Sequence, residues 1–351
     1  MTSLNPEIKE KADRISSAKF KHTALSNEFI KTMVKLSWLH TYKMMSETGT
    51  HPKDGWFFVG NNQVESMSLD TGPLSASDVL KNKIDLPSLP QVFEQITEVM
   101  SDPNSSAGDF ADIIIKDPAL SARILRIVNS AFYGFRSRVD TISHAVSIIG
   151  TNDLYSLSLS MSVLKMFDNI PGHVVDMKSF WQHAIACGII AKTIAEHQGF
   201  SNTERFFVTG LLHDIGRLVL YKYLPDETGG ALTRAGLNDS LLFQSESEVL
   251  GFNHSRIGGM LMKKWRLPSR LEHMVRFHHK PENSSYIHET AIIHVSDILA
   301  NAFDFGSSGE RFVPPLSEEI RDVLSLPPDL VQKAVDQATD QINDVTHMLM
   351  S

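Results

Sequence analysis

The apolar residues of this chain recur with helical spacing along almost its whole length, and this pattern limits the fold more than any other feature. No stretch shows the sustained two-residue alternation, flanked by hairpin turns, that is typical of β-strands. The one candidate strand is a short segment, GWFFVG, at residues 55–60. A length of 351 residues suits about two domains. Hydrophobic residues make up 42% of the chain, which is enough to build hydrophobic cores. We therefore predict an all-α protein.

A stretch rich in loop-forming residues separates the start of the chain from the rest. Apolar spacing predicts a helix from about residue 25 to 46, and residues 46–76 are rich in glycine, serine, asparagine and proline. We interpret residues 1–80 as a helical extension followed by a linker. The extension's helix, which includes Trp38, could pack on the rest of the protein or face a partner. Packing is favoured because exposed apolar stripes are uncommon.

Residues 86–170 are predicted to form a bundle of four or five short helices. Ser88, Asp117 and Thr151 each stand where a polar side chain could cap a helix start. The pattern breaks at Pro171 and the glycine after it. We find no cluster of acids, bases or nucleophiles here, so the chemistry of this unit is interpreted as packing.

A second helical unit, residues 173–303, completes a domain predicted to span 86–303. Beyond it, helix start signals occur at Ser317 and near Pro328. An amphipathic pattern then continues toward the end of the chain. We expect residues 316–351 to dock on the domain as a helical C-terminal cover.

The second unit is unusually rich in histidine. It holds ten of the chain's fifteen histidines, and several lie within apolar helical runs rather than on polar faces. The single cysteine, Cys187, cannot form an internal disulfide or a thiolate metal site. Any metal bound here would therefore use imidazole and carboxylate ligands, a set that suits Zn, Mn or Fe.

An adjacent histidine and aspartate, His213 and Asp214, lie in the apolar run GLLHDIGRLVL, which predicts a buried helix. Burying an aspartate costs several kcal/mol unless a cation or dense hydrogen bonding compensates it. A metal ion is one compensation, and an ion pair with Arg217 is another. For an isolated pair the structural ion pair is the commoner explanation.

Further histidines and a second aspartate in the same unit favour the metal. His183 and Asp297 both lie inside apolar helices. His254 sits where a helix could begin, and His278 with His279 where one could end. Each of them could be a satisfied core or helix-end residue. Together with Asp214, however, they supply the mixed imidazole and carboxylate set that a metal site needs.

Charge and hydropathy argue against two other classes of function. The net charge of −8 and a pI of about 6 provide no general field for nucleic acid or an anionic membrane surface. The basic run at 261–266 is interpreted as a solvated helix face, so a nucleic-acid adaptor is disfavoured. The N-terminal residues lack the apolar core of a secretion signal, and no apolar run reaches the roughly 18 residues of a membrane span. We expect a cytoplasmic protein without membrane insertion.

Two sets of residues resemble a known family. The order His183, then His213 and Asp214, then Asp297 resembles the ligand pattern of the HD metal-dependent phosphohydrolase superfamily. The stretches LPSLPQVFEQITEVMSDP and KDPALSARILRIVNSAFYGFRSRVDTISHAVSIIG strongly resemble the N-terminal half of the HDOD (HD-related output domain) family, a divergent branch of that superfamily. The resemblance runs from about Leu86 to Phe303. It implies an N-terminal helical bundle followed by an HD-like helical subdomain.

The resemblance implies two alternative functions. HDOD proteins are generally regarded as signalling or regulatory modules, and many are thought to have lost catalysis. The first hypothesis is therefore a regulatory module that acts on a signalling protein partner, without robust catalysis. The alternative is a metal-dependent phosphohydrolase acting on a nucleotide or another phosphate ester.

The resemblance also implies a ligand set, while leaving open whether a metal is bound. A divalent Fe, Mn or Zn ion would be held by His183, His213, Asp214 and Asp297. His254, His278 and His279 fall where the related HD-GYP cyclic di-GMP phosphodiesterases place ligands for a second metal. Arg217 replaces a lysine usual in those enzymes and would clamp phosphate in an enzymatic version. The segment after His279, KPENSSYIHE, lacks the GYP signature, which argues against cyclic di-GMP hydrolysis.

Overall fold

The computed structural model describes residues 5–24, 28–51, 86–130, 132–167, 170, 175–320 and 322–350. The candidate strand at 55–60 and most of the predicted linker lie outside the described residues. Within them every regular element is an α- or 3₁₀-helix, and no strand occurs. The prediction of an all-α fold is confirmed.

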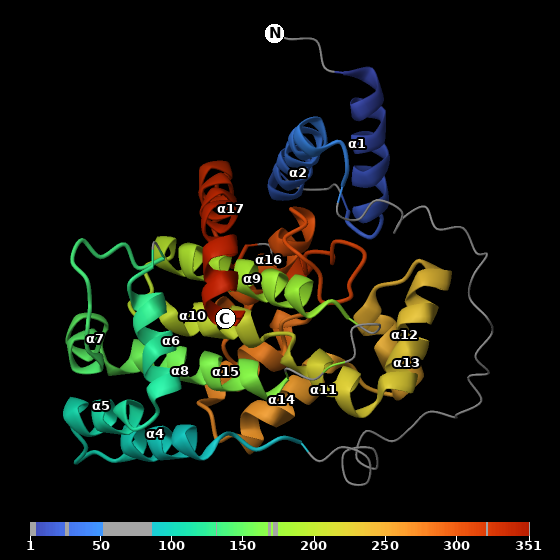
Figure 1. The fold of residues 1–351 in the computed structure, drawn as a ribbon. Helices are drawn as coiled ribbons and strands as arrows, with labels where there is room; N and C mark the ends of the chain where they lie inside the picture. Colours follow the sequence, from blue (N-terminus) through green and yellow to red (C-terminus); the bar gives the residue numbers. More distant parts are fainter. Residues whose placement is uncertain are drawn as a thin grey trace.

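The N-terminal extension contains two helices that pack side by side, α1 (Pro6–Lys19) and α2 (Glu28–Thr48) (Figure 1). The sequence predicted α2 but missed α1, which is highly charged and carries few large apolar residues. Its start signal was nevertheless present. Asn5 accepts a hydrogen bond from the backbone N–H of Glu7 at 3.0 Å, and Pro6 occupies the first turn, where its missing N–H costs nothing.

Five short helices form the unit that begins at residue 86. They are α4 (Gln91–Ser101), α5 (Ala107–Ile115), α6 (Pro118–Val128), α7 (Ile142–Ile149) and α8 (Thr151–Met166). Asp117 caps α6 by accepting two N–H groups of its first turn, as predicted. The predictions for Ser88 and Thr151 were wrong. Helix α4 begins after Pro90 without a side-chain cap, and Thr151 is the first helical residue of α8, after Gly150.

The histidine-rich unit surrounds one long buried helix. This helix is α9 (Met177–His197), and it packs against α10 (Glu204–Leu212), α16 (Ile287–Ala302) and α17 (Pro328–Met350). Between α10 and α16 lie α11 (Ile215–Tyr223), α12 (Pro225–Asn238), α13 (Leu242–Leu250), α14 (His254–Lys264), α15 (Ser269–Arg276) and a 3₁₀ turn, η1 (Pro281–Asn283). Ser317 precedes only a 3₁₀ turn, η2 (Glu318–Ile320). The C-terminal helix α17 crosses α9 (Figure 1).

A single cluster of buried apolar side chains runs from the N-terminal extension to the C-terminal helix. It includes residues of α2, all five helices of the bundle, α9, α10 and α17. The bundle and the histidine-rich unit therefore share one core, in which α10 packs against α8, and α17 packs against α6 and α8. Among the described helices, none has the length and apolarity to cross a membrane.

A buried ion pair ties the extension to the end of α16. The ammonium of Lys19 lies 2.6 Å from Oδ2 of Asp304 and donates to the carbonyl of Ala302 at 2.8 Å. The Ala302 carbonyl also accepts from the Ser37 hydroxyl of α2, at 2.5 Å. Both members of the ion pair are closed to solvent. A cation at a helix C-terminus complements the helix dipole, so the extension stabilises the end of α16.

One carboxyl group outside the histidine cluster is expected to make stability pH-dependent. Burial, assisted by the nearby Glu204 carboxylate and opposed by Lys192, raises the pKa of Asp153 to about 6. Between about pH 4 and 6 the folded protein therefore holds a proton that the unfolded chain has released, so stability falls as pH rises through this window. We expect Asp153→Asn to remove this fall. Thermal unfolding midpoints should match wild type near pH 4 and exceed it above about pH 6.

The matched control is Asp112→Asn, a change of the same kind at an exposed position on α5. This variant should follow the wild-type profile. If the unfolding midpoint of Asp153→Asn fell as steeply with rising pH as that of wild type, the raised pKa of Asp153 would not be the cause of the fall.

Candidate metal centre

His213 and Asp214 occupy a break between two helices. The sequence predicted one continuous helix here, and the structure corrects this: α10 ends at Leu212, and α11 begins at Ile215. The pair forms the turn between them, and both side chains are buried.

A close approach of two backbones places this turn against α14. A Cβ atom on Gly216 would lie 1.9 Å from the carbonyl oxygen of His254 and 2.8 Å from the nitrogen of Gly258. Only glycine permits this contact. Helices α11 and α14 therefore touch at the level of their backbones, and this brings His254 next to Asp214.

Four of the predicted ligands form a first group. Nε2 of His183, on α9, lies 3.2 Å from Oδ1 of Asp297, on α16. Nε2 of His213 lies 3.6 Å from the same oxygen and 3.4 Å from Oδ2 of Asp214. His183 and Asp214 Oδ2 are 4.0 Å apart. Two imidazole nitrogens and two carboxylate oxygens thus surround one point, and we name this group the first position.

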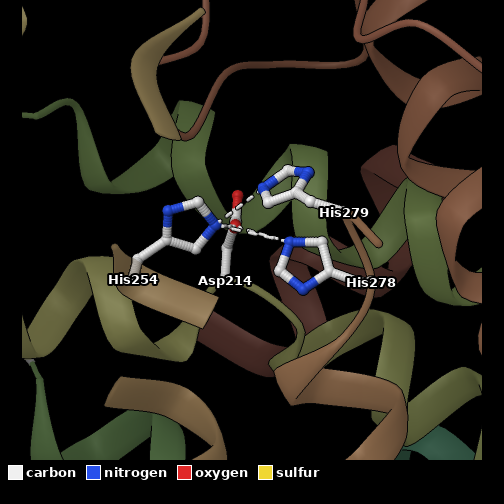
Figure 2. Close-up of side chains that lie close together, drawn as sticks. All are labelled: Asp214, His254, His278 and His279. Carbon is white, nitrogen blue, oxygen red and sulfur yellow. Dashed lines mark hydrogen bonds and ion pairs between the residues drawn. The ribbon is translucent and has the colours of Figure 1, made fainter. Parts of the chain in front are cut away.

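The other three predicted ligands gather on the opposite oxygen of Asp214 (Figure 2). Oδ1 of Asp214 lies 2.9 Å from Nε2 of His254 and 3.7 Å from Nε2 of His278. Nε2 of His254 lies 3.3 Å from that of His278 and 3.0 Å from that of His279. Figure 2 shows the three rings turned toward the carboxylate. We name this group the second position, and Asp214 is shared by both.

The hydrogen bonds of the outer ring nitrogens orient the imidazoles. Nδ1 of His213 and Nδ1 of His278 each lie within 2.7 Å of the backbone carbonyl three residues earlier. Nδ1 of His254 lies 2.6 Å from a carboxylate oxygen of Glu246. In His213 and His278 an Nδ1–H that donates to the carbonyl leaves the Nε2 lone pair directed into the cluster, which is the arrangement of metal-bound histidines. Sequence reasoning missed Glu246, whose only signal was a glutamate in the helix before His254.

Several buried polar atoms in this cluster lack a hydrogen-bond partner. Within the part of the chain that the structure describes, this holds for both ring nitrogens of His183 and for Nε2 of His213. Leaving such atoms unsatisfied in the interior costs about 1–3 kcal/mol each. A divalent cation would use these lone pairs and neutralise the carboxylates. The residues present therefore fit a transition-metal ion, and the nitrogen and oxygen donor set suits Zn, Mn or Fe.

The protonation states suit metal binding. Burial raises the pKa of Asp214, but Arg217, His213 and His254 outweigh it and hold that pKa well below its ordinary value. Burial, together with the neighbouring His213 and His254, lowers the pKa of His278 to about 3. For His213, burial lowers the pKa, yet the Asp214 carboxylate brings it well above its ordinary value. Metal ligands bind in their deprotonated form, so a metal at the first position would compete with the proton that the raised pKa of His213 favours.

Arg217 is enclosed by the protein rather than open to a ligand. Its guanidinium donates to the Ser308 hydroxyl at 2.6 Å and lies 3.4 Å from Asp214, 3.6 Å from Glu246 and 3.9 Å from Glu310. Its side chain is 2% exposed. This placement does not support the phosphate clamp suggested from the sequence. Arg217 instead stabilises three buried carboxylates. One of them is Asp214, whose ion pair with Arg217 was the alternative to a metal ion in the sequence analysis.

One further histidine close to Asp297 lies outside both positions. Nδ1 of His294 lies 2.6 Å from the carbonyl oxygen of His278. Its Nε2 accepts the backbone N–H of Ser317 at 3.1 Å. His294 therefore holds the backbone of His278 in place and connects it to the segment before α17.

An all-helical fold that gathers histidines and aspartates around a central histidine–aspartate pair defines a protein of the HD type. Residues 86–281 match the family model of the HDOD domain, more than half of the chain. The chain belongs to the HDOD family, as the resemblance predicted.

Three relatives place this assignment in context. An uncharacterised protein of Treponema pallidum (strain Nichols) is 27% identical over 199 residues, which are 56% of this chain and 38% of that protein. An HDOD domain protein of unknown function from Geobacter sulfurreducens has a TM-score of 0.60 at 21% identity, covering 78% of this chain and 95% of that one. A Shewanella amazonensis SB2B protein whose name proposes a phosphohydrolase also has a TM-score of 0.60, at 23% identity, covering 77% and 97%. At these identities the two solved structures establish the fold.

Proposed function

We propose that this chain is a regulatory HDOD module whose cluster binds two divalent transition-metal ions and whose surface acts on a signalling protein partner. The closed environment of the cluster carries this proposal. His183, His213, His254 and His278 are each 0% exposed, and His279 is half-buried. The second position has four protein ligands, and at the first position Asp297 joins His183, His213 and Asp214. Closed sites with four protein ligands are typical of metals that hold structure, whereas catalytic sites keep an open position.

Each ion would be held by residues from separate elements. The first position joins α9, the α10–α11 turn and α16, through His183, Asp214 and Asp297. The second joins the same turn to α14 and to the segment after α15. When bound, the ions would supply positive charge to the buried carboxylates and Lewis acidity at the site. Occupancy would thereby fix these five segments relative to one another, which is a means of coupling the cluster to a partner surface.

The first experiment measures metal and turnover together. Purified full-length protein, stripped and reconstituted with Mn, Fe or Zn, is analysed for bound metal and for thermal stability. We expect metal uptake and a raised midpoint, since a ligand at 100 times its Kd stabilises the folded state by about 2.7 kcal/mol. We expect a panel of phosphomonoesters, phosphodiesters and cyclic dinucleotides to be turned over no faster than by Asp214→Ala. Absence of metal uptake would overturn the proposal.

A second experiment tests the partner. Metal-loaded and metal-stripped full-length protein are used as parallel baits, and we expect a signalling protein to be retained by the loaded form. Equal recovery by both forms would contradict the coupling of metal to partner binding.

The second candidate function is a metal-dependent phosphohydrolase for a nucleotide or another phosphate ester. The observation that favours it is the sharing of Asp214, since a carboxylate between two metals is typical of two-metal hydrolases. Turnover that depends on Asp214 in the same panel would establish this function in place of the regulatory one.

A further inference from the structure

A small cavity of about 250 Å³ adjoins the second position. It lies between the start of α14 and the segment that follows α15, and His279 is the one candidate metal ligand among its lining residues. We name it the His279 pocket. Its lining residues are Phe243, Asn253, Ser255, Arg256, Arg276, Phe277, His279, Lys280 and Asn283.

The lining of the His279 pocket is strongly cationic. Arg256, Arg276 and Lys280 contribute three positive charges, and no lining residue is acidic. The described contacts place one carboxylate near them, that of Glu272, 3.4 Å from Arg276. The whole chain carries a net charge of −8, so this local group of positive charges is opposite in sign to the net charge of the protein. Such a pocket attracts an anion.

The start of α14 adds to the same field. This 11-residue helix begins at His254, and Asn253 caps it by accepting the backbone N–H of Arg256 at 3.3 Å. Asn253 and Ser255 both line the pocket. The N–H of His254 donates to the buried Glu246 carboxylate at 2.9 Å, so two of the first N–H groups are already paired. The start of the helix nevertheless lies beside the three cations, and its dipole adds to their positive field.

An aromatic side chain forms another part of the lining. The ring of Phe243 stacks on that of His279, with centroids 4.3 Å apart and planes inclined by 16°. His279 itself reaches the second position through Nε2. The imidazole of His279 thus lies between the pocket and the second position, and the ring of Phe243 stacks on this imidazole.

We propose that the His279 pocket binds a small phosphate ester, with its phosphate held by Arg256 and Lys280 and its organic part against Phe243. The guanidinium fork of arginine suits phosphate oxygens, and the volume of the pocket limits the ligand to a small one. The inference deepens the proposed regulatory function and rests on it: the ester is the signal that the module senses beside its second position. Binding in the pocket would alter the surroundings of His279, and through it the cluster.

The test uses inorganic phosphate and phenyl phosphate as probes, with full-length metal-loaded protein and calorimetric titration. We expect phenyl phosphate to bind more tightly than inorganic phosphate, and Phe243→Leu to remove that difference. We expect Arg256→Glu and Lys280→Glu each to weaken both probes by about tenfold or more, since a hydrogen bond to a charged group contributes about 1.5–3 kcal/mol. Metal content should stay at the wild-type level in all three variants.

Lys263→Glu provides the matched control, because it makes the same charge reversal at an exposed position on the last turn of α14. This variant should bind both probes with wild-type affinity. If Lys263→Glu weakened binding equally, the net charge of the protein would be what attracts the probes, and the proposed binding site would be wrong. Absence of probe binding by the wild-type protein would also contradict the proposal. Probe binding without any metal uptake would instead contradict the proposed function and leave the pocket standing.

Discussion

Asp214→Asn is expected to abolish metal binding at both positions of the cluster. Its two carboxylate oxygens face different ligand groups, Oδ2 toward His213 and Oδ1 toward His254. An amide has one weaker donor oxygen and no charge, so neither position keeps its shared ligand. Changes in residues that only support a ligand already weaken metal affinity by about 10- to 100-fold, and loss of this ligand should cost more. Elemental analysis after reconstitution should find neither ion, and added metal should no longer raise the unfolding midpoint.

The matched control for this prediction is Asp297→Asn. Asp297 is as deeply buried as Asp214, but it belongs only to the first position, together with His183 and His213. This variant should lose one ion and retain the other. If Asp214→Asn also retained one ion, Asp214 would not be a ligand shared between two metals.

Gly216→Ala is expected to cause the largest loss of stability among single methyl additions in the domain. The new Cβ would stand 1.9 Å from the His254 carbonyl oxygen, and the atoms it meets are backbone atoms, which cannot rotate away. Helices α11 and α14 would have to separate. Overpacking typically costs about 1–3 kcal/mol, and a backbone clash of this depth should reach or exceed the upper end of that range. Urea unfolding should show the loss, and the second position should lose affinity because His254 moves.

Gly229→Ala offers a direct comparison. Gly229 also lies within a helix, α12, but its added Cβ would meet nothing within 4 Å. Alanine is the better helix former by about 1 kcal/mol, so this variant should be slightly more stable than wild type. A Gly216→Ala variant as stable as Gly229→Ala would contradict the backbone contact between α11 and α14.

The sequence was sufficient to predict the fold class and the candidate ligands. Helices α9 and α16 are long and mostly apolar on all sides, so His183 and Asp297 could be recognised as polar residues on buried helices. The structure then brings the other six predicted ligands into one cluster with Asp214. The resemblance implied that the ligands divide into two groups. Neither it nor the spacing could show that Asp214 takes part in both, because that depends on the turn at His213 and on the packing of α11 against α14.

The residues that support the ligands were harder to foresee. Glu246 is an ordinary helical glutamate in the sequence, and its role depends on a contact with His254 that arises only in the fold. Gly216 follows the histidine–aspartate pair closely, yet its close contact lies 38 residues away in the sequence. The family resemblance implied a phosphate-binding role for Arg217 in an enzymatic version, but three buried carboxylates surround it. Local pattern predicts elements and residue types, whereas long-range contacts decide these roles.

The tie between Lys19 and the end of α16 bears on how the protein can be divided into working fragments. The region that matches the family model ends at residue 281, before α16, so a fragment with those limits would lack Asp297. A fragment extended through Phe303 would include Asp297. It would still lack Lys19, the cation that stabilises the last turn of that helix. A fragment that also includes Asp304 would leave its carboxylate without the Lys19 ammonium that lies 2.6 Å away in the full chain. A polypeptide meant to retain the first position therefore needs the N-terminal helices as well as the domain.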